Sequence, residues 1–117
     1  SQEKSIYLQI SEMIETDILR GILLEEERVP STNELAKMYT INPATAAKGV
    51  NILVDSGILY KKSGIGMFGA SGAKEASKAS RKKKFKENFV VALVKEAKGL
   101  GINKAEIVSM IESVMED

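Results

Sequence analysis

The chain of 117 residues contains neither cysteine nor histidine. Without cysteine it can form no disulfide and no thiolate metal site. Without histidine it lacks the commonest general base and the commonest metal ligand, so a Ser-His-Asp triad is impossible. No paired carboxylate or lysine constellation stands out in their place. We therefore expect a protein that is not an enzyme and that uses no metal and no cofactor.

Long apolar runs are also missing, and tryptophan is absent. A membrane-spanning helix needs about 20 consecutive apolar residues, and the longest runs here are only a few residues long. Nothing resembles a signal peptide. A hydrophobic content of 44% and a charged content of 28% are ordinary for a globular protein. The expected location is the cytoplasm, with no membrane partner.

The chain has almost no excess of charge of one sign, since the formal net charge is only +1. Residues 1–69 carry seven Lys and Arg against nine Asp and Glu, whereas residues 70–117 carry ten against seven. The densest basic run, Lys78–Lys86, holds six cations and no acid. Bulk charge does not predict a polyanionic partner, so any such prediction must rest on local patches and motifs.

The first part of the chain carries the signals of three helices. Isoleucine recurs every four residues between Ser5 and Gly21, which predicts an amphipathic helix. Ser31 and Glu34 have the spacing of a capping box at the start of a short second helix. Asn42 as N-cap and Pro43 at the first position open a third helix that runs to about Ser56. Two short helices joined by a turn suggest a helix-turn-helix.

A β-hairpin is expected directly after the third helix. The short apolar runs Ile58–Tyr60 and Met67–Phe68 flank a tip that contains Gly64 and Gly66. A hairpin in this position is a wing, so the predicted fold is mainly α with a small β-hairpin, a winged helix-turn-helix over residues 1–69.

The tail, residues 70–117, is expected to be a linker followed by two helices. Ala70–Ser80 is rich in small residues and is predicted to be a linker or a frayed helix start. One helix follows from Arg81 to about Lys98, and a last helix begins at the cap Asn103. Two helices cannot bury broad apolar stripes alone, so the tail is predicted to be a dimerisation segment, although it can also fold back on its own N-terminal part. The candidate seam is Phe85, Phe89, Leu93, Ile107, Met110, Ile111 and Val114.

Six segments follow one another in a characteristic order: Ile6–Ile10, Gly21, Arg28–Ala36, Asn42–Thr45, Asp55–Tyr60 and Gly64–Phe68. As an ordered set they resemble the DNA-binding domain of the GntR family of bacterial regulators, and the tail resembles the short C-terminal segment of the YtrA-type subgroup. The resemblance implies a transcription regulator, by family analogy a repressor, that binds a palindromic operator in double-stranded DNA as a homodimer. A small-molecule effector is implied only as an option.

The candidate DNA contacts lie at two helix N-termini and in the wing. A helix N-terminus with a nearby cation binds phosphate, and the first turn of the third helix should meet the major groove. Lys61 and Lys62 point to opposite faces of a strand, so one at most should face DNA. The predicted contacts are Arg28, Ser31, Thr32, Asn42, Ala44, Thr45, Lys48, Lys62, Gly64 and Gly66.

Each contact also has a purely structural interpretation. Arg28 can pair with one of the acids Glu25–Glu27, and Ser31 can serve only as a cap. Thr45 can merely help to satisfy the backbone amides of the first helical turn, and the wing glycines can merely adopt the dihedral angles that the turn requires. Winged helices also dock partner proteins, and the acidic balance of residues 1–69 slightly favours this alternative of a protein-interaction module without specific DNA binding.

Overall fold

The computed structural model of the chain describes residues 5–116. The chain divides into two compact units, and the division falls between Ala79 and Ser80. The first unit holds three helices, a small sheet and the beginning of a fourth helix. Over its described residues, the second unit has helices as its only regular secondary structure.

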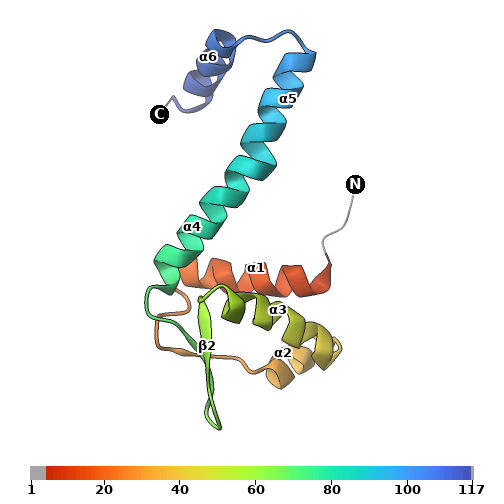
Figure 1. The fold of residues 1–117 in the computed structure, drawn as a ribbon, viewed down its shortest axis with the longest axis vertical. Helices are drawn as coiled ribbons and strands as arrows, with labels where there is room; N and C mark the ends of the chain where they lie inside the picture. Colours follow the sequence, from red (N-terminus) through yellow and green to blue (C-terminus); the bar gives the residue numbers. More distant parts are fainter. Residues whose placement is uncertain (1–4, 117) are drawn as a thin grey trace. The chain divides into compact units, whose positions relative to one another are not determined.

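The three helices of the first unit are α1 (Ile6–Leu19), α2 (Thr32–Tyr39) and α3 (Pro43–Asp55), seen in Figure 1. These bounds agree with the predicted helices to within one or two residues. The isoleucine pattern of α1 is also confirmed in part, because Ile10, Ile14 and Ile18 are buried. Ile6, however, is 51% exposed, since it lies at the first residue of the helix.

Helices α1 and α3 pack closely because of a glycine in the middle of α3. A Cβ atom added to Gly49 would lie 2.5 Å from the backbone carbonyl oxygen of Tyr7 and 3.3 Å from the Cβ of Ile10. A side chain at this position would therefore push α1 away. Glycine lowers helix propensity by about 1 kcal/mol relative to alanine, so its place here is explained by packing.

The sheet has three antiparallel strands in the order β1-β3-β2. The predicted hairpin is formed by β2 (Leu59–Lys62) and β3 (Gly66–Gly69), in which Lys61 pairs with Met67 and Lys62 with Gly66. The strand that the sequence did not predict is β1 (Arg28–Val29), which pairs with β3. Two residues are too few to show the alternation from which a strand is predicted.

Helix α4 (Ala73–Phe85) begins inside the segment that was expected to be a linker or a frayed helix start. Ala73 and Ser77 are completely buried, and Ala73 belongs to the apolar core that α1, α2, α3 and the sheet enclose. Small residues allow the helix to approach this core closely, which explains why a segment without large apolar residues is ordered. The division between the two units therefore falls within α4.

The second unit contains the end of α4, a π-helical turn at Lys86–Val90, α5 (Val91–Gly99) and α6 (Lys104–Val114). The predicted cap of the last helix is present: the Glu106 amide donates to Asn103 Oδ1 at 2.9 Å, and the Asn103 amide donates to Glu106 Oε1 at 3.1 Å. The π-helical turn was not predicted, because a wider turn leaves no clear mark on apolar periodicity.

Candidate nucleic-acid interface

Helix α3 buries one side and presents the opposite side to solvent. Ala46, Gly49, Val50 and Leu53 form its buried side. The N-terminus is capped as predicted, because the Ala44 amide donates to Asn42 Oδ1 at 2.7 Å. Residues three or four apart share a helix face, and the exposed ridge opposite the core is formed by Ala44, Lys48 and Asn51.

Lys48, the cation of this ridge, is exposed and rests against α1. Its Nζ lies 4.1 Å from the ring centroid of Tyr7, in a cation–π contact. Such a contact holds the ammonium near the surface of α3 without neutralising it, and is worth about 0.5–1 kcal/mol at an exposed site. Thr45 lies half-buried at the flank of the ridge. The predicted contacts of α3 are therefore open to an approaching partner, with Lys48 oriented by α1.

The N-terminus of α2 is stabilised by the predicted capping box. The Glu34 amide donates to Ser31 Oγ at 3.1 Å, and the Ser31 amide donates to Glu34 Oε1 at 2.8 Å. The Ser31 amide and the Ser31 side chain both hydrogen-bond the Glu34 carboxylate, and together with the charge of Arg28 they lower the pKa of Glu34 below its ordinary value of 4.5. The Ser31 hydroxyl accepts from the Glu34 amide as the cap, so the structural role that the sequence offered for Ser31 is present.

Arg28 pairs with Glu34, at 3.5 Å from its guanidinium, and with none of the three acids next to it in sequence. Each of those acids accepts another hydrogen bond: Glu25 from the Gly72 amide, Glu26 from the Tyr60 hydroxyl and Glu27 from the Leu24 amide. Both side chains of the Arg28–Glu34 pair are 52% exposed. An exposed pair of this length contributes little stability, so Arg28 can exchange its partner for a phosphate at small cost.

The outer face of the wing carries a row of stacked groups. The ring centroids of Tyr60 and Phe68 are 5.8 Å apart, and Lys62 Nζ lies 5.1 Å from the Phe68 centroid. The Tyr60 hydroxyl donates to Glu26 Oε1 at 2.6 Å, and this hydrogen bond raises the pKa of Tyr60 above its ordinary value. Lys62 is exposed and lies on the same face of the sheet as Tyr60 and Phe68.

Both predicted wing glycines require their residue type. Gly64 has a φ of 76° and lies in open space, whereas Gly66 has a φ of 146° and faces Arg28. A Cβ atom at Gly66 would lie 3.0 Å from Arg28 Nε. Gly66 thus leaves room for the arginine side chain at the first residue of β3, next to the hairpin tip.

A groove of about 290 Å³ lies between α2, α3 and the wing. Three predicted contacts line it: Ser31, Thr32 and Gly66. Three further polar residues line it that sequence reasoning did not select: Asn33, Asn51 and Lys61. Helical spacing from Lys48 would have indicated Asn51, but which of two adjacent wing lysines faces α3 depends on the strand register.

The predicted dimer residues all lie in the second unit. Most are exposed, with Phe89 at 64% and Val114 at 83%, and only Ile107 is partly covered. Phe85 and Phe89 contact each other, with ring centroids 5.7 Å apart. Between α5 and α6 an apolar groove of about 210 Å³ is lined by Leu93, Ile107, Met110 and Ile111, among others. These residues are thus collected in one unit with little of their apolar surface buried.

Metal binding and membrane insertion each require a particular arrangement of residues. Within this range no group of three or more Asp and Glu side chains is arranged to hold a metal ion. Within the same described residues, no helix has the combined length and apolarity that crossing a bilayer requires.

Comparison with known proteins gives consistent results along the whole chain. The family model of the bacterial regulatory proteins of the gntR family matches residues 6–68. The chain is 31% identical to the HTH-type transcriptional regulator YhcF of Bacillus subtilis over 113 residues, which cover 97% of this chain and 92% of YhcF. It is 36% identical over 63 residues to the transcriptional repressor NagR of the same organism, which cover 54% of this chain but only 26% of NagR.

Solved structures agree with the family match. A GntR-family transcriptional regulator from Bacteroides thetaiotaomicron matches with a TM-score of 0.80 at 36% identity, covering 96% of this chain and 97% of that chain. BusR of S. agalactiae, solved in complex with its busAB-promotor DNA, matches with a TM-score of 0.65 at 28% identity, covering 96% of this chain and 53% of BusR. The chain therefore belongs to the GntR family of bacterial regulatory proteins and is a DNA-binding transcription regulator with a winged helix-turn-helix.

Proposed function

We propose that this regulator is a cytoplasmic repressor that binds a palindromic operator as a homodimer. The observation that carries the proposal is the capped helix α3, whose ridge of Ala44, Lys48 and Asn51 is exposed beside the wing. Small side chains at the N-terminus of such a helix allow close approach to base edges in the major groove, and Ala44 or Thr45 can contact a thymine methyl group. BusR and NagR support the assignment as a DNA-bound relative and as a named repressor.

The proposed contacts lie in three places. Arg28 of β1, together with Ser31 and Thr32 at the N-terminus of α2, would bind phosphates and set the position of the protein on the duplex. Asn42 caps α3, and Ala44, Thr45 and Lys48 lie in it. Gly64 and Gly66 allow the wing backbone to approach a minor groove. Few of these residues are cations, so roughly 4–8 phosphate contacts per dimer are expected, with a correspondingly modest salt dependence.

The homodimer is supported by the apolar surface of the second unit. Its helices expose Phe85, Phe89, Met110 and Val114, and a second copy of the chain would cover such residues. Two-fold symmetry would then place two copies of α3 on half-sites one helical turn, about 10 base pairs, or a multiple of it apart. A small-molecule effector stays an option that only the family resemblance implies.

Selection of bound fragments from a random duplex pool tests the proposal directly. We expect the wild-type chain to recover a two-fold symmetric sequence, and recovery of no preferred sequence would contradict an operator-specific regulator.

Lys48→Ala tests the role of α3 on the duplex so selected. Losing one phosphate or guanine contact per protomer should weaken binding by about 1–3 kcal/mol, measured by fluorescence anisotropy at physiological salt. Lys104→Ala is the matched control, because it removes an equal charge from the second unit. An unchanged affinity for Lys48→Ala would remove Lys48 from the interface.

A further inference from the structure

The groove between α2, α3 and the wing has a lining suited to an anion. Ser31, Thr32 and Asn33 contribute polar groups from the start of α2, and Asn51 contributes an amide from the ridge of α3. Lys61 is its one cation, and none of its lining residues is a carboxylate. Val50, Val54 and Met67 supply its apolar part. This combination of polar, cationic and apolar groups suits a strand of alternating phosphates and sugars.

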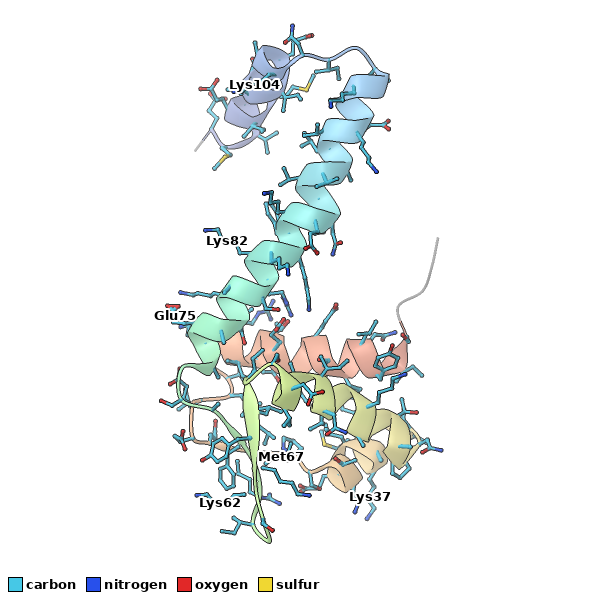
Figure 2. The ribbon with its side chains drawn as sticks, viewed as in Figure 1. Lys37, Lys62, Met67, Glu75, Lys82 and Lys104 are labelled. Atoms are coloured by element: carbon cyan, nitrogen blue, oxygen red, sulfur yellow. The ribbon has the colours of Figure 1, made fainter. Side chains whose placement is uncertain are left out.

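Strand register decides which wing lysine belongs to this groove. Lys61 pairs with Met67, and both line the groove. Successive side chains of a strand point to opposite faces, so Lys62 lies on the other face, where its Nζ sits over Phe68. Figure 2 labels Lys62 and Met67, which lie on opposite sides of the hairpin. The two lysines carry equal charge and are both exposed, yet only Lys61 faces α3.

The geometry of duplex DNA predicts that a sugar–phosphate strand lies between α3 and the wing. The major and minor grooves are neighbours separated by one sugar–phosphate strand. A protein that places a helix in one groove and a hairpin in the next must therefore straddle that strand. In this chain the space between the two elements is the groove that Lys61 and Asn51 line.

We propose that this groove holds one DNA strand, in which Lys61 binds a phosphate and Asn51 hydrogen-bonds the same strand. The inference rests on the proposed function and adds two residues to its contacts. It transfers to Lys61 the DNA contact that was predicted for Lys62. A cation that neutralises a phosphate releases a condensed counterion, so its loss has a measurable signature in the salt dependence of binding.

The experiment compares Lys61→Ala with Lys62→Ala on the duplex selected by the wild-type chain. Affinity is measured by fluorescence anisotropy between about 50 and 200 mM salt, a range over which phosphate contacts dominate the change. Lys61→Ala should lower the slope of log K against log salt by about 1 per protomer, Lys61→Arg should restore it, and Lys62→Ala should keep the wild-type slope. Thermal melting checks that each variant is folded, which is expected because both lysines are exposed.

Asn51→Asp provides a second, independent readout. A carboxylate in the groove would repel the phosphates, so binding should weaken by at least about tenfold at low salt and by less at high salt. Ser109→Asp adds the same charge at an exposed position of α6 and serves as the control.

The outcomes separate this inference from the proposed function. If wild type binds but Lys61→Ala keeps its slope, or Lys62→Ala loses as much, the strand does not lie in this groove. The same holds if Asn51→Asp binds like wild type. If the wild-type chain binds no duplex at all, the proposed function fails and the inference fails with it.

Discussion

Glu34 connects the local chemistry of one residue to the stability of the first unit. Its carboxylate accepts the Ser31 amide and lies near Arg28, and these contacts lower its pKa below 4.5. A depressed pKa in the folded state means that the ionised group stabilises the fold at pH values above 4.5. This stabilisation is lost as the pH falls through the lowered value.

Glu34→Gln tests this linkage, because glutamine keeps the acceptor for the capping box but has no charge. We expect wild type to melt at a higher temperature than Glu34→Gln above pH 4.5, with the difference shrinking as the pH falls below that value. Circular dichroism melting between about pH 3 and pH 7 measures the difference. A gap that is constant over this range would show that the charge of Glu34 plays no part.

Single residues were predicted unevenly from sequence. The capping box of α2 and the caps Asn42 and Asn103 were predicted, since each depends on partners within three residues along the chain. The partner of Arg28 was not among the acids nearest to it in sequence. The contact of Lys48 with Tyr7 was not predicted either, because it joins two helices that are far apart in the chain.

At the scale of elements, the packing of α1 on α3 depends on Gly49. Gly49→Ala would place a Cβ atom 2.5 Å from the Tyr7 carbonyl oxygen, a backbone atom that cannot rotate away. Overpacking of this kind costs about 1–3 kcal/mol, which alanine's higher helix propensity offsets only by about 1 kcal/mol. We therefore expect Gly49→Ala to lower the urea midpoint of unfolding.

Gly99→Ala is the control for this experiment. Gly99 also lies in a helix, but a Cβ atom there would meet nothing within 4 Å. This variant should be at least as stable as wild type because only the propensity term acts. Equal midpoints for Gly49→Ala and wild type would mean that α1 moves away from α3 without cost.

Elements with a strong local signal were predicted, and those without one were not. The three helices of the first unit and the hairpin have caps, apolar periodicity or turn glycines. Strand β1 exists because Arg28 and Val29 pair with β3, and the first turns of α4 are ordered because Ala73 and Ser77 meet the core. The local sequence pattern predicts neither feature, since both arise from contacts between residues that are far apart in the sequence.

At the scale of the whole molecule, the main energetic cost is the apolar surface that the second unit exposes to water. Among its described residues only Ala97 is buried, although α5 and α6 carry many large apolar side chains. Phe89→Asp should raise the dissociation constant of the proposed homodimer by about 100-fold, because an unpaired charge would be placed in an apolar seam at a cost of about 3 kcal/mol. Sedimentation equilibrium measures the change.

Ser109→Asp again supplies the matched control, with one added carboxylate at an exposed polar position of α6. It should sediment like wild type. A dimer that persists in Phe89→Asp with wild-type affinity would place the interface elsewhere, and a wild-type monomer would contradict the homodimer itself.

The sequence by itself determined the fold class, the family and most of the helix bounds, because caps, apolar periodicity and turn residues act over a few neighbouring positions. Only the tertiary structure decided which side chains share a surface. It assigned Lys61 to the groove beside α3 and Lys62 to the opposite face, and it placed Tyr7 beneath Lys48. The reason is physical: strand register and helix packing are set by contacts between distant parts of the chain.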